Sequence, residues 1–252
     1  MRGNLSLRAL SDALTVTEVR EVPETETVWM SRGAREGQLA QPLGRKKLEI
    51  QVTVFAKAWE AVERTRLYGK LCAFCLPGAY TFSHRPGETL YVDTAEVSGL
   101  PGITAWTGTF TLLLRASLLP YFVREPETRV LEGRELLEEI DTPEGAGVLC
   151  EIEGVNQQAA EMTECLVETY LGEERLSMIY VPGLTLSAGE SILFSLDSHL
   201  CQQILAGSIS VLGKRTAESS DTLVFTPGET VLLHLSANRR ARWEVKLYGL
   251  SW

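Results

Sequence analysis

Residues 219–252, SSDTLVFTPGETVLLHLSANRRARWEVKLYGLSW, contain two runs in which apolar and polar residues alternate. In residues 231–236 a Val and two Leu share one parity, and in residues 242–248 a Trp, a Val and a Leu do. Successive side chains of a strand point to opposite faces, so each run predicts a strand with one face in a core. Asn238 tolerates left-handed backbone, so residues 236–239 are predicted to be the turn between the two strands. The pattern indicates the closing hairpin of an antiparallel β-sandwich.

The same alternation predicts further strands along the chain, separated by turn signals. Half of the ten prolines are followed directly by glycine, which is typical of a β-rich protein with short connections. Together with the two terminal runs, the strands predicted after residue 147 number about eight, as expected of a sandwich or jelly roll. The predicted strands are residues 148–152, 165–171, 176–181, 191–196, 204–211 and 222–225.

The N-terminal half has strands of its own and one change of period. Residues 47–55 alternate cleanly and predict a strand, whereas residues 58–75 show helical spacing. Small residues recur on that helix at four-residue intervals (Ala61, Thr65, Gly69, Ala73), which predicts close packing of this stripe on a sheet. Residues 33–47, GAREGQLAQPLGRKK, have no regular period and are predicted to be a long loop, of the kind that is usually functional or disordered.

Composition limits the classes of function. The chain has 252 residues, a formal net charge of −9 and a pI near 5.0, which argues against phosphate-backbone binding as its main role. Five cysteines do not make a disulfide framework and favour a reducing compartment. No apolar run has the length of a membrane span and no signal peptide is recognisable, so we expect a soluble protein made in a cytoplasm. Residues 121–147 are rich in glutamate and predict an acidic linker.

Few residues carry a pattern that indicates chemistry. Cys72 and Cys75 have the spacing of a redox or zinc pair, but no second pair of ligands accompanies them, so we interpret them as core thiols. The three histidines, His84, His199 and His234, are scattered and have no nucleophile motif beside them. The glutamates between residues 161 and 174 could be paired for glycoside hydrolysis, but a solvated face explains them better. We therefore expect no enzyme, no cofactor and no metal.

A basic turn precedes Trp243. Arg239, Arg240 and Arg242 could bind nucleic acid, could form salt bridges to an acidic neighbouring subunit, or could be plain solvated surface. Three arginines in an acidic protein are weak support for nucleic-acid binding, and solvated surface is the preferred interpretation.

Four stretches carry a resemblance to a known family: GRKKLEIQVTVFAKAWEAVERTRLYGKL, PGETLYVDTAEVSGLPGITAWTGTFTLLLRASLLPYF, SAGESILFSLDSHLCQQILAG, and the Ser/Asp-rich turn with TPGE and the last two strands. Together they span most of the chain, and each motif is degenerate. The sequence resembles the distal tail proteins of long-tailed (siphovirus-type) bacteriophages, with a galectin-like C-terminal domain.

The resemblance implies a mainly β fold with two β-sandwich-like domains. Residues 1–122 would form the N-terminal ring-forming domain with helix 58–75, residues 123–147 the acidic linker, and residues 148–252 the galectin-like sandwich. The protein would be a non-enzymatic virion tail component, a hexameric ring that joins the tail tube to the tail-tip hub protein. Its C-terminal domain would attach a receptor-binding protein in some phages.

The resemblance also implies where the subunits meet and what the ring encloses. Residues 33–47 would reach the neighbouring subunit, and DNA would pass transiently through a lumen that the acidic excess suits by repulsion. The six residues assigned to the subunit interface are Arg35, Leu39, Leu43, Arg45, Lys46 and Lys47.

The sequence is also compatible with other functions. The chain could be a tail tube or tail-tip protein, including one of a phage-derived particle, or a carbohydrate-binding β-sandwich module with Trp243 and Trp252 as its late aromatics. A hydrolase with a divergent site would need a pocket of perturbed carboxylates. A galectin-like fold does not itself confer sugar binding, and we predict no sugar site.

Overall fold

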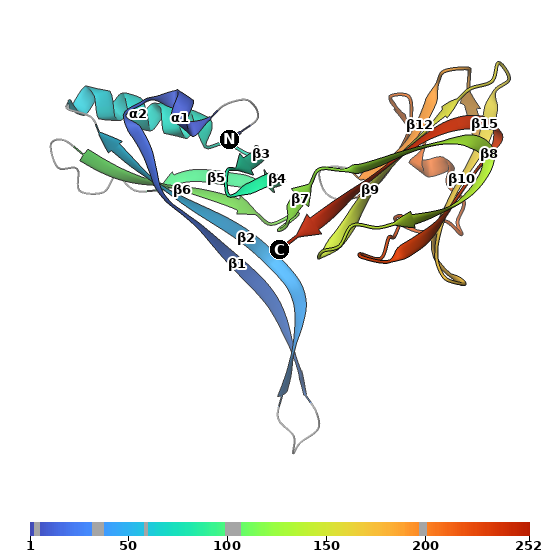
Figure 1. Cartoon of the computed structure of the whole chain (residues 1–252), viewed down its shortest axis with the longest axis horizontal. Coiled ribbons are helices and arrows are strands. Elements are labelled where there is room, and N and C mark those ends of the chain that lie inside the picture. Colours follow the sequence, from blue (N-terminus) through green and yellow to red (C-terminus); the bar gives the residue numbers. More distant parts are fainter. Residues whose placement is uncertain (3–5, 32–37, 58–59, 99–106, 197–200) are drawn as a thin grey trace. The chain divides into compact units, whose positions relative to one another are not determined.

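The computed structural model describes residues 1–2, 6–31, 38–57, 60–98, 107–196 and 201–252, with the side chains of residues 8, 26–31, 38–44 and 107 left aside. The chain divides into two units, Met1–Phe122 and Val123–Trp252. Both are built mainly from antiparallel strands, as the sequence predicts (Figure 1). The short strand β7 (Phe122–Arg124) lies at the division.

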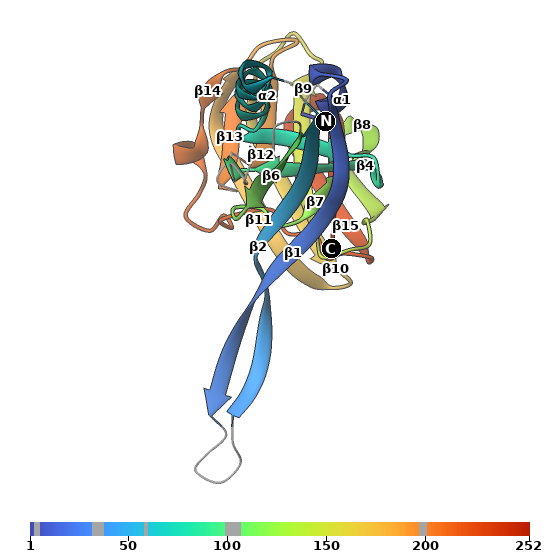
Figure 2. The same ribbon diagram turned by 90° about the vertical axis from the view of Figure 1, so that its left-hand side faces the viewer.

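The N-terminal unit contains a four-stranded antiparallel sheet. Its order is β1 (Leu14–Ser31), β2 (Gln38–Lys57), β6 (Thr107–Ala116) and β5 (Thr94–Ser98). Only the second half of β2 pairs with β6, so β1 and β2 continue as a two-stranded hairpin beyond the sheet (Figure 2). The remaining elements of this unit are α1 (Leu7–Leu10), α2 (Ala61–Phe74), β3 (Gly78–Phe82) and β4 (Arg85–Val92).

The core of this unit follows from the alternation on β2. Leu48, Ile50 and Val54 are fully buried and pack with the apolar side of α2. On α2 that side consists of Leu67 and Leu71 together with Phe74, which are spaced four and three residues apart. The prediction of a small-residue stripe against the sheet is therefore wrong.

The stripe faces solvent instead. Ala61, Thr65, Gly69 and Ala73 are all exposed, and a methyl group at Gly69 would meet nothing within 4 Å. Large apolar side chains bury more surface than small ones, so the Leu and Phe face occupies the core.

The predicted loop at residues 33–47 is also wrong over most of its length. Residues 33–37 lie outside the described part, but Gln38–Lys57 is one strand paired with β1 from Gln38 onward. Two register shifts, one between Lys47 and Arg45 and one between Gly44 and Pro42, account for the missing period, since each shift moves side chains to the other face.

The C-terminal unit is a two-layered arrangement of antiparallel strands. One path runs β14 (Ile209–Ser210), β13 (Gln202–Ala206), β12 (Ser191–Leu196), β9 (Gly147–Asn156) and β15 (Thr230–Ser251). Strand β15 also pairs with β10 (Met162–Leu171), which pairs with β11 (Glu174–Leu186). A 3-10 turn, η1 (Leu212–Lys214), follows β14, whereas predicted strand 222–225 is irregular.

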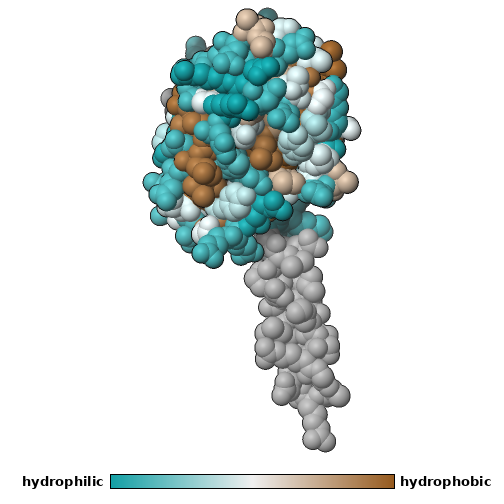
Figure 3. All heavy atoms as spheres, turned by 90° about the vertical axis from the view of Figure 1, so that its right-hand side faces the viewer, coloured by the Kyte–Doolittle hydropathy of each residue, from teal (hydrophilic) through white to brown (hydrophobic). Residues whose placement is uncertain are grey.

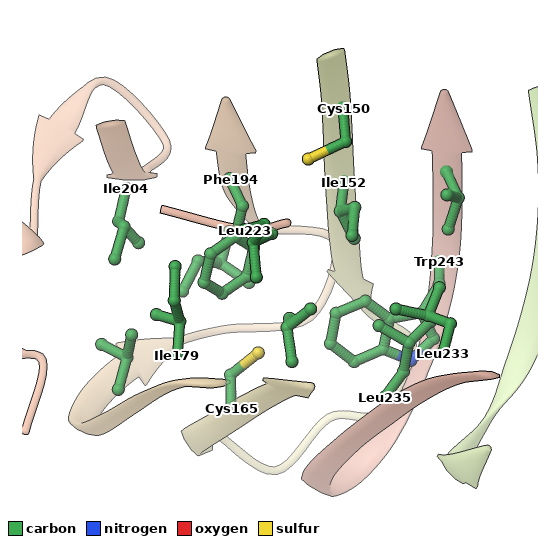
Figure 4. Close-up of a cluster of buried hydrophobic side chains, with 14 of the residues drawn as sticks. Cys150, Ile152, Cys165, Ile179, Phe194, Ile204, Leu223, Leu233, Leu235 and Trp243 are labelled. Atoms are coloured by element: carbon green, nitrogen blue, oxygen red, sulfur yellow. The ribbon is translucent and has the colours of Figure 1, made fainter. Parts of the chain in front are cut away.

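Strand β15 replaces the predicted closing hairpin. It runs without a turn through residues 236–239, pairing with β10 up to Ala237 and with β9 from Ala241 onward. The hairpin prediction is wrong because the chain absorbs the extra residues as an irregularity in a continuous strand rather than reversing. The side chains on its buried parity, Leu233, Leu235 and Trp243 among them, form the centre of the core with Ile152 (Figure 4).

The predicted acidic linker contains a strand. Strand β8 (Glu127–Asp141) pairs with β15 on both sides of the irregularity, from Thr230 to Leu247. Most of its side chains are exposed, which explains the lack of an apolar period in this sequence. Arg129 reaches the backbone carbonyl of Glu139 at 3.5 Å, so a charged side chain closes part of this edge.

Candidate assembly surfaces

Two open edges bound the sheet of the N-terminal unit. Within the described residues, β1 pairs only with β2 and β5 pairs only with β6. Strand β1 exposes Val16 and Val19 to 39% and 37%. An edge strand presents unpaired backbone N–H and C=O groups, which make it a template for pairing with another chain.

The hairpin that extends from this sheet, which we call the arm, comprises residues 25–31 of β1 and 38–45 of β2. At its base the backbone N–H of Arg45 donates to the hydroxyl of Tyr121 at 3.3 Å. The guanidinium carbon of Arg45 lies 5.9 Å from the centre of the Tyr121 ring. Burial lowers the pKa of Arg45. The arm is therefore tied to the unit at its base.

Of the six predicted interface residues, Leu39, Leu43 and Arg45 lie in the arm, and Lys46 and Lys47 follow it directly in β2. Lys46 pairs with Glu24 at 3.4 Å and is mostly exposed, and Lys47 lies 3.5 Å from Glu49. Leu39 lies opposite Met30 in the strand register, and Leu43 is also in β2, but their side chains are not described. Arg35 lies outside the described residues. Whether these residues contact a neighbouring subunit stays a prediction.

A polar cluster holds β1 to β4 just before the arm. Both carboxylate oxygens of Glu21 accept hydrogen bonds from Arg85, from Nε at 2.7 Å and from Nη2 at 2.8 Å. Glu88 accepts from the same guanidinium at 3.1 Å, His84 Nε2 lies 3.0 Å from Glu21, and Arg85 stacks on Phe122 at 4.3 Å. The hydrogen bond from Arg85 lowers the pKa of Glu21, and the same bond raises the pKa of Arg85. A two-point bond of this kind fixes direction as well as distance.

Sequence reasoning missed this cluster. Glu21 and Arg85 are 64 residues apart, and neither belongs to a motif. The only signal in the sequence is Glu21 on the core parity of β1, opposite Ile50, where a carboxylate needs a partner.

The face of the sheet that points away from α2 is polar and balanced in charge. Arg115 donates to Glu49 at 2.6 Å and lies 2.8 Å from Glu96. Hydrogen bonds from Gln51 and then from Arg115 lower the pKa of Glu49. By strand register this face carries four acidic and four basic residues: Glu18, Glu24, Glu49, Glu96, Arg20, Lys47, Lys57 and Arg115.

The acidic excess of the chain belongs to the other unit. Residues 1–122 carry 14 Lys and Arg against 12 Asp and Glu, whereas residues 123–252 carry 10 against 21. The net charge of −9 therefore gives no support to the expectation of an acidic lumen formed by the N-terminal unit.

The C-terminal unit has its own ionic network on the outer face of β15 and β10. Nδ1 of His234 lies 2.8 Å from Glu168, whose other oxygen accepts from Arg175 at 3.2 Å. Burial acts to raise the pKa of Glu168, but hydrogen bonds from His234, Tyr170 and Arg175 outweigh it, and the pKa is lowered. Nε2 of His234 lies 3.7 Å from Glu135 on β8.

The cysteines and histidines that the sequence offered as candidates for catalysis do not form one site within the described residues. Cys72 and Cys75 lie at the end of α2, where burial is the main reason that the pKa of Cys75 rises to about 11. His84 and His234 lie in different units, and His199 lies outside the described residues. In the part that the structure describes, no three His, Cys, Asp or Glu side chains are grouped to hold a metal ion.

Trp243 and its basic neighbours also have structural roles. Trp243 is fully buried, so it offers no surface to a sugar, while Trp252 is 55% exposed. Arg240 lies 3.4 Å from Glu132, and Arg242 lies 3.8 Å from Glu244. The ion pairs of these two arginines are within the chain.

The exposed surface shows few other features. The face in Figure 3 is mostly hydrophilic, with hydrophobic surface confined to separate patches. In the described part of the chain, no helix combines the length and the hydropathy needed to cross a membrane.

Comparison with known proteins gives matches among solved structures. No family model and no curated protein sequence matches the chain. The crystal structure of the Dit protein (gp 19.1) of phage SPP1, described as a paradigm of the hub adsorption apparatus in phages that infect Gram-positive bacteria, is similar with a TM-score of 0.66. Identity is 17%, and the match covers 94% of each chain. This chain shares the fold of that protein.

Two further matches are weaker. The phage P2 baseplate in its activated conformation with Ca gives a TM-score of 0.49 at 12% identity, covering 92% of this chain and 90% of that one. The phage p2 baseplate with Sr gives 0.45 at 10% identity, covering 93% and 90%.

Proposed function

We propose that this protein is a structural component of a phage tail tip, and that its N-terminal units join side by side into a closed ring. The observation that carries the proposal is the four-stranded sheet with an open edge at β1 and another at β5. Pairing of one edge with the opposite edge of the next copy is a heterologous contact, which closes into a ring if the rotation permits. The fold shared with SPP1 Dit over nearly the whole chain supports this role.

A hexamer is the ring that the sequence resemblance to distal tail proteins implies. One side of the ring would stack on the tail tube and the other on the tail-tip hub protein. The C-terminal unit, residues 123–252, would be the galectin-like domain and could attach a receptor-binding protein. No catalytic step, cofactor or membrane anchor is part of this proposal.

The polar face of the sheet is the surface that would line the lumen, because α2 covers the opposite face. Its charges are balanced and partly paired, as at Glu49 and Arg115. Such a surface neither attracts nor repels phosphates strongly, so DNA would pass without adhesion. This replaces the repulsive acidic lumen that net charge alone suggests.

The arm would reinforce the ring by reaching the neighbouring copy. Arg45, Lys46 and Lys47 stand at its base, and Glu21 with Arg85 holds β1 where the arm departs. A two-stranded hairpin has no core of its own. The contacts at the base of the arm would therefore set the direction in which it projects.

The experiment measures mass by light scattering across concentration, with negative-stain images of the same samples. Val19→Lys places a charge at the β1 edge, and Val62→Lys is the matched control, since Val62 is 77% exposed on α2. We expect wild type and Val62→Lys to form rings and Val19→Lys to remain a folded monomer. Rings of unchanged mass from Val19→Lys would contradict the edge-pairing model.

A second variant tests the arm separately. Residues 26–44 are replaced by an Asn-Gly turn, which keeps Thr25 opposite Arg45 as in the present register. The shortened protein should fold, as judged by circular dichroism, and its rings should dissociate at a higher protein concentration than wild type. Rings of equal stability would show that the arm has no part in assembly. A wild type that is monomeric both alone and with tail-tube protein would overturn the ring itself.

A further inference from the structure

The partly buried histidine of the C-terminal unit, His234, lies between two carboxylates on different strands. His234 on β15 lies opposite Glu168 on β10 in the register, and Glu135 on β8 lies diagonally across on the other side. The side chain of His234 is 17% exposed, that of Glu168 is 9% exposed, and that of Glu135 is 71% exposed. His234 therefore connects the interior strand pair to the edge strand.

The geometry determines which nitrogen carries a proton. The carboxylate of Glu168 can only accept, so Nδ1 of His234 at 2.8 Å must donate to it. The pKa of Glu168 is lowered because its three hydrogen bonds outweigh burial, which keeps it ionised. In neutral imidazole, Nε2 is then a bare acceptor.

That bare acceptor has no hydrogen-bond partner within the described part of the chain and no solvent contact. Its nearest ionic neighbour is Oε1 of Glu135 at 3.7 Å, which is also an acceptor. Two acceptors facing each other repel, whereas a proton on Nε2 would turn the pair into a charge-assisted contact. The arrangement is completed by one proton from solvent.

We propose that Nε2 of His234 is a proton-binding site that fastens the edge strand β8 to the sheet through Glu135. Proton uptake converts the imidazole to imidazolium and leaves both carboxylates ionised, so His234 then donates on both sides. The other titratable or charged groups on this face are Tyr170 on β10 and Arg175 on β11, both engaged with Glu168, and Glu139 on β8, which lies diagonally across on the side away from Glu135. Arg175 is 53% exposed, so solvent screens its repulsion of the imidazolium.

Hydrogen–deuterium exchange of β8 in the full chain tests the proposal. Peptides covering residues 135–141 are compared at about pH 5.5 and about pH 7.5, with labelling times scaled to the intrinsic rate. We expect protection in wild type to be about 2- to 5-fold greater at the lower pH, the range of a partly exposed ion pair. Exchange of peptides from strand β12 at the same two pH values serves as the internal reference.

Matched variants distinguish the proposed contact between His234 and Glu135 from general effects of pH. His234→Gln and Glu135→Gln should each remove the pH dependence, whereas Glu139→Gln on the same strand and His84→Gln in the other unit should retain it. Equal protection of β8 at both pH values in wild type, or an unchanged ratio in Glu135→Gln, would overturn the proposal. Nitrogen NMR of the His234 ring gives a direct second reading, and a neutral form protonated on Nε2 would also refute it.

Discussion

Gly154 on β9 lies opposite Trp243 on β15, and the indole ring occupies the space where a side chain would begin. A Cβ added at Gly154 would lie 2.6 Å from Cζ3, 2.8 Å from Cε3 and 3.1 Å from Cη2 of Trp243. Carbon atoms in favourable contact are about 3.5–4.0 Å apart. Gly154→Ala therefore requires a displacement of roughly 1 Å in a ring that is fully buried.

The cost follows from where the ring could go. Trp243 packs in the same core as Ile152 and Val245, which are themselves buried, so the neighbours have little room to yield. Overpacking of this kind costs about 1–3 kcal/mol. The reduced freedom of Ala in the unfolded chain returns about 0.4–1 kcal/mol, so we expect a net loss of about 1–2 kcal/mol.

Urea unfolding followed by far-ultraviolet circular dichroism measures the change. Gly213→Ala is the matched control in the same unit, because a methyl group there would meet nothing within 4 Å. We expect Gly213→Ala to change the free energy of unfolding by less than about 0.5 kcal/mol.

A double-mutant cycle with Trp243→Leu identifies the cause. If the indole is the obstacle, Gly154→Ala should cost at least about 1 kcal/mol less in the Leu background than in wild type. Equal costs in both backgrounds would refute the steric argument, as would a Gly154→Ala protein as stable as Gly213→Ala.

Two further predictions concern charge and reactivity. Glu21→Gln should destabilise the N-terminal unit by about 1–2 kcal/mol at neutral pH, since Arg85 loses its charged partner. Because Arg85 lowers the folded pKa of Glu21, this stabilisation is present above the unfolded pKa and lost as pH falls through the folded pKa. Urea midpoints of wild type and variant should therefore converge in acid; a constant gap would contradict this. A thiol reagent should modify the exposed Cys201 first and reach Cys150 and Cys165 only on unfolding, because burial raises the pKa of Cys150 to about 12 and raises that of Cys165. Mass spectrometry that finds Cys165 labelled in folded protein would contradict it.

The alternation of apolar residues predicted the fold class well but missed the path of β15. From residue 231 to residue 249 its buried residues, among them Val231, Leu235, Ala237 and Ala241, all fall on odd positions. An unbroken parity is a sign of one strand, and Asn238 alone suggested a turn. Two small alanines weaken the apolar signal at the point where the strand changes partner.

Strand β8 and the face of α2 were missed for different reasons. An edge strand with both faces exposed needs no apolar period, since its partner β15 supplies the hydrogen bonds. On α2, the positions of Leu67, Leu71 and Phe74 show the correct stripe, and the small residues drew attention to the opposite side. The size of the side chains should have decided between the two faces.

The contacts of the candidate site could not be predicted from sequence. Glu21 meets Arg85, and Glu168 meets His234, across separations of 64 and 66 residues. Only the register of the folded strands brings these charges together. The sequence did place an interface near Arg45, Lys46 and Lys47 by resemblance, and that assignment awaits the ring experiments.

The shared position of β15 in both layers has a consequence for how the protein is made. Every other strand of the C-terminal unit precedes it in the chain, yet β8 and β9 take their main partner from it, and β10 takes one of its two partners from it. On a ribosome these strands emerge before the strand that joins them, so the two layers stay separate until β15 has left the exit tunnel. Contacts between such distant segments form slowly. Unpaired strand edges invite association with other chains during that interval. The acidic residues of β8 would then keep nascent copies apart until the final strand arrives.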